Sequence, residues 1–357
     1  MRKTYITTIA VFLLMVLNSS AQEPFRVPDF NKDIRPILSE NCFQCHGPDE
    51  ANRKAKLRLD NNDFLKRRSK NGKSLVAPKQ PEESELYVRL ITHEAGELMP
   101  PAKSGKALTK DQINSFKSWI LQGAKWSEHW AFITPSQPAV PKVKDPSFIK
   151  NSIDNFIVHE LDKRNLSPSS EASREVLLRR VTLDLTGLPP TPKEIEDFLA
   201  DKSANAYERV VDRLLNSSHY GERMAMQWLD YARYADSNGF QTDSSRSMWP
   251  WRDWVIDAFN RNMPFDQFSI QQIAGDLLPN PSSNPSQIIA TGFNRNHRLN
   301  GEGGLIAEEW RIETVIDRVE TTGLTWLGLT LGCARCHDHK YDPLSQKDFY
   351  QLFAFFN

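Results

Sequence analysis

The sequence predicts a mainly α-helical protein with two domains. Apolar residues recur at spacings of three and four in most of the long segments, which is the period of an amphipathic helix. Patterns of alternating polar and apolar residues, which would indicate strands, are weak throughout. The chain has 357 residues, which is long enough for two cores of ordinary size.

The N-terminus has the pattern of a secretory signal peptide. Two basic residues precede an apolar run over residues 9–17, and small residues lead up to Ala21. This order predicts a signal peptide over residues 1–21 that is cleaved after Ala21. An uncleaved anchor is the alternative, but the run is shorter than the ~20 residues that a membrane span needs. No later stretch is suited to span, so we expect an exported protein of the periplasm or cell surface.

The charge of the chain is balanced overall but uneven locally. Lys plus Arg and Asp plus Glu number 45 each, so the net charge is zero, which argues against a nucleic-acid partner. Residues 53–73, however, are strongly basic and include only Asp60 and Asp63 as acids. This segment is either a solvated loop or a docking patch for an acidic redox partner protein.

One five-residue pattern occurs twice, at residues 42–46 (CFQCH) and at residues 333–337 (CARCH). Two thiols separated by two residues, with a histidine directly after them, are the attachment signature of c-type haem. On a helical turn the two thiols face the same way and can bond two neighbouring vinyl groups, while the histidine binds iron. The two copies use every cysteine of the chain: Cys42, Cys45, Cys333 and Cys336.

A redox dithiol and a zinc site are the alternative interpretations of a CxxC pair. Neither gives a reason for the histidine that follows each second cysteine, His46 and His337. Unpaired thiols are also a liability in an oxidising compartment, and thioether bonds to haem would remove all four. We therefore expect two covalently attached haem c groups.

Residues 26–126 are expected to form the first domain. Apolar residues at helical spacing precede Cys42, and Thr109 with Gln112 forms a capping box for a closing helix. A helix before the haem motif, loops around the ring and a terminal helix are the plan of a small class I cytochrome c. A domain of this size has little core of its own, so haem would supply much of it.

A sixth iron ligand is expected from a loop downstream of the first motif. Met99 lies between Leu98 and a pair of prolines, which restrict the backbone and would hold its thioether in place. A methionine ligand raises the reduction potential. His93 is the rival ligand, and core filling is the alternative role for Met99.

Prolines punctuate residues 127–147, which predicts an extended and fairly stiff linker. His129, near the start of the linker, is a further possible ligand. From residue 148 to residue 357 the apolar stripes are mostly helical, with long connecting loops between them. We therefore expect a larger helical domain over 148–357, which contains the second CxxCH motif.

Both domains resemble known families. Residues 29–126, with NCFQCHG, LRLD and LMPP, resemble the planctomycete-type cytochrome c domain of large exported bacterial proteins. LDLTGLPPTPKEIEDFLAD, AGDLLP and GLTWLGLTLGCARCHDHKYDPLSQKDFYQLFAFF resemble the uncharacterised domain, domain of unknown function 1549, that commonly follows it. The resemblance implies haem at Cys42 and Cys45, with His46 proximal and Met99 distal. It also implies a second haem motif in a domain whose activity is not established.

Relatives of this kind usually continue into a further C-terminal domain, whereas this sequence stops at Asn357. The last segment, residues 349–356, carries an apolar helical stripe of Phe and Leu. We expect a partner or a further domain to cover that stripe. The sequence leaves open whether the chain is a truncated version of a longer protein.

For the second haem, His337 is the proximal candidate. His297, Met224 and Met226 are distal candidates, and an open sixth position is equally compatible with the sequence. His339 is discounted because it would have to cross the ring plane. An open position permits chemistry at iron, whereas a filled one favours electron transfer.

Two other clusters of residues are candidates for a functional site. Four acidic residues recur along one face of a predicted helix: Glu309, Glu313, Asp317 and Glu320. This face is either exposed to solvent or, together with Glu302 or Glu308, forms a metal or acid–base site. Residues 246–254 (RSMWPWRDW) are rich in tryptophan, which indicates core packing or a surface for stacking sugars. Nucleophile elbows, phosphate loops and HExxH motifs are absent from the sequence.

These observations favour an exported dihaem c-type cytochrome that transfers electrons. Two alternatives stay open: a redox enzyme that acts through the second haem on an extracellular substrate, such as a polysaccharide, and a carbohydrate-binding or scaffold protein with accessory haem.

Overall fold

The structure is a computed structural model that describes residues 27–69, 71–279 and 284–357. Fourteen α-helices make up most of its regular structure, and within these ranges the only β-type pairing is two isolated bridges. The mainly α-helical class predicted from the sequence is therefore confirmed. The predicted signal peptide lies outside the described residues.

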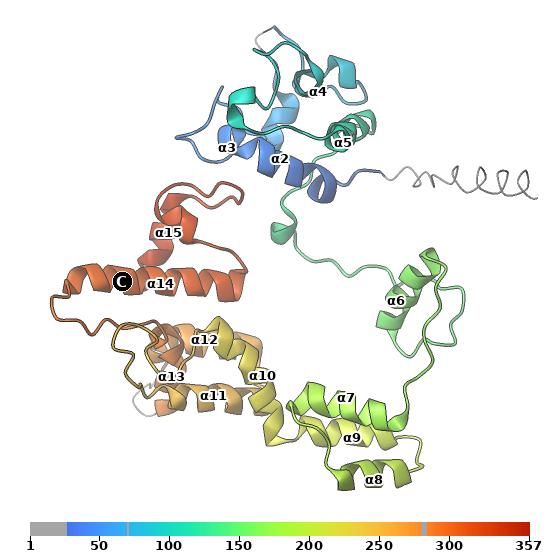
Figure 1. Ribbon diagram of the computed structural model, residues 1–357, viewed down its shortest axis with the longest axis vertical. Helices are drawn as coiled ribbons and strands as arrows, with labels where there is room; N and C mark the ends of the chain where they lie inside the picture. The colour runs from blue at the N-terminus through green and yellow to red at the C-terminus, as the bar shows by residue number, and fades with distance from the viewer. Residues whose placement is uncertain (1–26, 70, 280–283) are drawn as a thin grey trace, which may run out of the picture. The chain divides into compact units, whose positions relative to one another are not determined.

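The chain divides into two compact units (Figure 1). The first comprises the described residues up to Pro135 together with Cys336–Gln346, and the second comprises Ser136–Arg335 and Lys347–Asn357. Residues 133–151, around the division, contain no helix. Among the described helices of both units, none is long and apolar enough to cross a membrane.

Four short α-helices build the first unit, and a π-helical turn (Phe30–Ile34) precedes them. They are α2 (Arg35–Asn41), α3 (Phe43–His46), α4 (Glu85–Ile91) and α5 (Lys110–Leu121). The helix α5 begins with the capping box that the sequence predicts: the Thr109 hydroxyl accepts from the Gln112 N–H (3.2 Å), and the Thr109 N–H donates to Gln112 Oε1 (2.9 Å).

One apolar core holds these helices together. Its most deeply buried members come from the first turn, from α2, from α3, from the 3₁₀ turn Asn62–Lys66 and from α5: Phe30, Ile34, Leu38, Phe43, Phe64, Phe116, Trp119 and Ile120. The Trp119 indole nitrogen satisfies its donor by bonding the carbonyl of Lys125 at 2.8 Å. Burial of the large aromatic residues supplies most of the driving force for this small unit.

Ten α-helices build the second unit. In chain order they are α6 (Ser152–Lys163), α7 (Arg174–Thr186), α8 (Pro192–Ala200), α9 (Ala206–Leu215), α10 (Ser218–Tyr231), α11 (Trp249–Asn260), α12 (Phe265–Ala274), α13 (Pro285–Ala290), α14 (Ala307–Thr322) and α15 (Gln346–Phe353).

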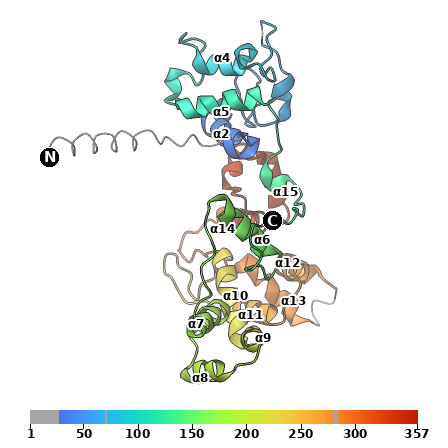
Figure 2. The ribbon, with the colours of Figure 1, turned by 90° about the vertical axis from the view of Figure 1, so that its right-hand side faces the viewer.

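The core of the second unit lies among α10, α11, α12 and α13, which Figures 1 and 2 show gathered together. Aromatic rings fill it, with Trp228, Trp251, Trp254, Phe268 and Phe293 in mutual contact. A smaller cluster of Leu178, Phe198 and Ala206 joins α7, α8 and α9.

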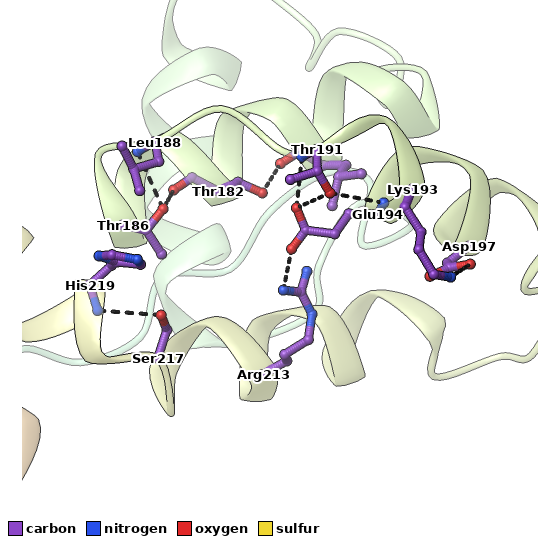
Figure 3. Close-up of polar contacts among 11 residues, drawn as sticks. Thr182, Thr186, Leu188, Thr191, Lys193, Glu194, Asp197, Arg213, Ser217 and His219 are labelled. Carbon is purple, nitrogen blue, oxygen red and sulfur yellow. Dashed lines mark hydrogen bonds and ion pairs between the residues drawn. The ribbon is translucent and has the colours of Figure 1, made fainter.

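Polar contacts define the start of α8 (Figure 3). The Thr191 hydroxyl accepts from the Glu194 N–H at 3.3 Å, and the Thr191 N–H donates to Glu194 Oε2 at 2.7 Å. Glu194 also forms an ion pair with Arg213 of α9. One carboxylate thus caps one helix and ties it to the next.

The apolar stripe near the C-terminus is partly covered within the chain. Phe349 is buried and Leu352, Phe353 and Phe356 are half-buried, whereas Phe355 is 83% exposed. A C-terminal partner for this helix stays a prediction.

Candidate functional site

The first CxxCH motif occupies a break between two helices. Cys42 ends α2 and begins α3, and its backbone departs from helical geometry (φ −121°, ψ −36°). The N–H groups of Cys45 and His46 both donate to the carbonyl of Cys42, at 3.0 and 2.8 Å. The motif therefore forms one tight turn, and Cys42 and Cys45 lie close together.

Beside this turn is a cavity of about 460 Å³, within the ~300–1,000 Å³ range of cofactor pockets. Cys42, His46 and Met99 all line it. The wall between them is largely apolar and comes from α2, α4, α5 and the loop after the motif: Leu38, Leu57, Leu59, Leu75, Leu86, Leu90 and Phe116. Folding brings the predicted proximal and distal ligands into one apolar cavity.

A backbone hydrogen bond fixes the position of Met99. Its N–H donates to the carbonyl of Arg89, near the end of α4, at 2.8 Å, and its side chain is half-buried. The rival ligand His93 is exposed and is not among the residues that line the cavity. The geometry therefore favours Met99 over His93 as the distal ligand.

The environment of the His46 imidazole suits a metal ligand. Burial lowers the pKa of its imidazole, and the positive charge of Arg67 acts in the same direction. Its Nδ1 atom is buried without a hydrogen-bond partner among the described residues. Neutral imidazole is the form that binds metals. An orphaned ring nitrogen, two neighbouring thiols and an apolar cavity together fit haem c.

Basic residues of the segment 53–73 reach this cavity, which sequence reasoning did not anticipate. Arg67 and Arg68 line it, together with Arg89 of α4. Arg67 donates to the carbonyls of Ala55 and Lys56, and Arg68 donates to that of Gly72. Guanidinium groups at this wall suit the carboxylates of a haem. No sequence signal placed them there, because the loop has no periodic pattern.

An apolar cavity with a CxxCH turn on its wall is the arrangement expected of a c-type cytochrome domain. In agreement, residues 42–103 match the family described as "Planctomycete cytochrome C". Haem binding, through covalently bound haem c, and electron transfer are the functions that this match supports.

Residues 152–357 match the family described as "Protein of unknown function (DUF1549)". Because this match spans more than half of the chain, the protein belongs to that family, and the fusion expected from the sequence is confirmed. No curated protein and no solved structure matches the chain.

The second CxxCH motif is arranged differently. Cys333, Cys336 and His337 are all exposed, and of the two cysteine pairs only the first has its members close together. The Nδ1 atom of His337 lies 2.7 Å from the carbonyl oxygen of its neighbour Asp338.

The other predicted ligands are engaged elsewhere. His297 is buried, and its ring nitrogens lie near the carbonyl of Arg298 (3.1 Å) and the guanidinium of Arg318 (3.4 Å). Met226 is 55% exposed and Met224 half-buried, both on α10.

Two histidines instead organise loops. His339 is buried, and its Nδ1 atom accepts from the N–H groups of Tyr341 and Asp342, at 3.3 and 2.9 Å. His129 accepts from the Ala131 N–H at 3.3 Å. Both imidazoles thus have local structural roles.

Of the tryptophan-rich segment 246–254, Trp251 and Trp254 are buried in the core and only Trp249 is more than half exposed. This outcome agrees with core packing rather than with a sugar-stacking surface.

The acidic residues on α14 divide into two groups. Glu308 and Glu309 are exposed, as is Glu302 before the helix, whereas Glu313, Asp317 and Glu320 line a second cavity. Across the described ranges, no group of three or more His, Cys, Asp or Glu side chains is placed to hold a metal ion.

Proposed function

We propose that this protein is an exported c-type cytochrome that transfers electrons through haem c attached to Cys42 and Cys45, with His46 and Met99 as its axial ligands. The observation that carries the proposal is the presence of Cys42, His46 and Met99 on the wall of one apolar cavity. The family match over the same residues supports it. Export is supported by the signal-peptide pattern of residues 1–21.

When haem is bound, its iron supplies one-electron redox chemistry. The protein itself has three roles in this site. The thiols of Cys42 and Cys45 anchor the haem, and His46 and Met99 bind and orient it. The leucine-rich wall excludes water, which lowers the local dielectric and thereby tunes the reduction potential. A thioether ligand such as that of Met99 raises this potential relative to a second imidazole.

The proposal includes a second haem c on Cys333 and Cys336, with His337 as its proximal ligand. What supports it is the motif spacing alone. Both thiols and the imidazole of His337 are exposed. Mass spectrometry of protein matured with the haem-attachment machinery would count the groups. Two haems on the wild type and one on a Cys333→Ala/Cys336→Ala variant are expected, and one haem on both would limit the proposal to the first motif.

An acidic redox partner protein is the third part of the proposal. The basic segment 53–73 supports it, because clustered charge steers a complementary partner. Electron transfer to such a partner should slow as ionic strength rises, since salt screens surface charges beyond a distance of about 8–10 Å at physiological ionic strength. A rate that is independent of salt would remove this part of the proposal.

The Met99→Ala variant tests the axial ligation. Loss of the thioether should abolish the sulfur-to-iron absorbance band of the oxidised protein and lower the reduction potential, because a weaker or exchangeable ligand replaces it. The matched control is His93→Ala, which removes the rival ligand and should leave both properties unchanged. An intact band in Met99→Ala would contradict the assignment.

A further inference from the structure

A second cavity lies wholly within the second unit, beside the middle of α14. It measures about 140 Å³, and its wall combines α14 with His297 and Arg298 from the loop after α13 and with Arg335. This volume is close to the ~150 Å³ of an engineered cavity that accommodates benzene. The space therefore suits a single six-membered ring.

Charges on this wall are largely compensated. Arg335 binds Glu313 through both of its terminal nitrogens, at 2.6 and 3.3 Å, and Arg233 binds Asp317 at 2.7 Å. Glu320, the third carboxyl on the same helix face, makes no hydrogen bond or ion pair with another described side chain. A cavity with little net charge favours a neutral ligand over an ion.

Glu320 differs from its neighbours in its environment. Burial raises the pKa of its carboxyl, and the adjacent charge of Asp317 raises it further. A carboxyl group that keeps its proton more readily can donate a hydrogen bond as well as accept one. Hydroxyl groups have the same dual capacity, so they are suitable partners for this side chain.

One residue of the cavity wall has an unsatisfied donor. The indole nitrogen of Trp310 is buried without a hydrogen-bond partner in the described part of the chain. Buried donors in native proteins almost always have a partner, so this nitrogen indicates that a hydrogen-bonding molecule belongs here.

The wall is also held rigidly. Trp310 stacks on Phe240 with ring centroids 5.9 Å apart, and the guanidinium of Arg298 lies 4.7 Å from the centre of the Phe240 ring. The Trp310 ring, one face of which stacks on Phe240, is an apolar part of a wall that is otherwise largely polar. That combination fits a ring whose carbons are apolar and whose edge carries hydroxyls.

We propose that this cavity binds one ring of a neutral, polyhydroxylated molecule, such as a pyranose sugar, with Glu320 and Trp310 as its principal hydrogen-bonding groups. The proposal uses residues of the second unit alone. One of them, Arg335, belongs to the second CxxCH motif, so the proposal concerns the protein without haem at that motif. It gives the unit a ligand class that the family description leaves open.

Titration calorimetry of the full-length Cys333→Ala/Cys336→Ala protein, in which only the first motif can carry haem, tests the proposal, with glucose, galactose, mannose, xylose and myo-inositol as probes. We expect at least one probe to bind with a stoichiometry of one. Affinity should fall about tenfold or more in Glu320→Ala and Trp310→Phe, because each loses a hydrogen bond to a hydroxyl. The matched control is Glu309→Ala, an exposed change on the same helix, which should bind like the wild type.

Three results would overturn the proposal. One is the absence of binding by every probe up to about 100 mM, a concentration that detects even very weak affinity. Another is unchanged affinity in both cavity variants, which would place the sugar elsewhere. The last is a crystal structure, grown with the tightest probe, in which the cavity holds water alone. Circular dichroism of each variant would establish that it is folded.

Discussion

At the scale of single residues, burial decides which groups of the haem site are reactive. Cys42 and Cys45 belong to one turn, yet the first is packed against the core and the second is exposed. Burial raises the pKa of the Cys42 thiol to about 12. Since the thiolate is the nucleophile, two chemically identical residues should behave very differently before haem is attached.

Thiol labelling of the haem-free protein measures this difference. At about pH 8 only roughly one Cys42 in ten thousand would be ionised, so we expect three fast thiols and one slow thiol with a disulfide reagent. In the Cys42→Ser control the slow phase should vanish while the three fast ones remain. Four equal rates would show that Cys42 is not buried.

Glu320 provides a second residue-scale prediction, which concerns stability. Its pKa is raised in the folded state by burial and then by Asp317. The ionised form therefore costs stability above the folded pKa, and this cost disappears as the pH falls toward the unfolded value. Glu320→Gln should be more stable than the wild type near pH 8, and the two should converge near pH 4.

Urea unfolding between these two pH values would follow that convergence. Glu309→Gln, on the exposed side of α14, serves as the reference for removing a charge from this helix. A stability difference for Glu320→Gln that is constant with pH would show that the carboxyl is not perturbed.

At the scale of elements, close helix packing depends on single small residues. Gly221 of α10 faces α11: its N–H donates to Asn260 Oδ1 at 2.8 Å, and Asn260 in turn donates to the carbonyl of Ser218 at 3.1 Å. A Cβ atom at residue 221 would meet the carbonyl oxygen of Ile256 and lie 2.6 Å from the Asn260 amide. Only glycine allows the two helices to approach this closely.

The Gly221→Ala variant separates two opposing effects. Alanine improves helix propensity by about 1 kcal/mol, whereas overpacking against a rigid backbone costs about 1–3 kcal/mol. The Ile256 carbonyl belongs to a helix and cannot move aside cheaply, so we expect net destabilisation of about 1–2 kcal/mol in chemical unfolding. Gln227→Ala, an exposed change on α10, should stay within about 0.5 kcal/mol of the wild type. A stabilised Gly221→Ala would show that the interface is looser than described.

At the scale of the whole molecule, the two units depend on haem to different degrees. The first unit surrounds a cavity of about 460 Å³ that haem would fill, whereas the second has a core of packed aromatic side chains. Filling a cavity with a covalently bound apolar group stabilises only the unit that contains it.

Scanning calorimetry should therefore resolve two transitions. In Cys42→Ala/Cys45→Ala, which cannot attach the first haem, the transition of the first unit should fall by many degrees while that of the second unit stays in place. The wild-type protein, matured in the same cells, is the reference. A single transition that shifts as a whole would show that the units unfold together.

The sequence by itself determined the helical class, the capping box at Thr109 and the turn of the first CxxCH motif. These features depend on residues three or four positions apart, and local chemistry is sufficient to specify them. The same reasoning from motif spacing predicted a second haem at residues 333–337. Spacing alone could not indicate that those side chains would be exposed.

Only the tertiary structure decided which distant residues meet. It placed Met99 rather than His93 on the wall beside His46, drew Arg67 and Arg68 to that wall, and buried Trp251 and Trp254 instead of presenting them to sugars. It also separated Glu320 from the exposed acids of α14 and placed it on the wall of the cavity that Trp310 lines. The physical reason is that burial and desolvation depend on what packs around a side chain, which spacing along the chain does not encode.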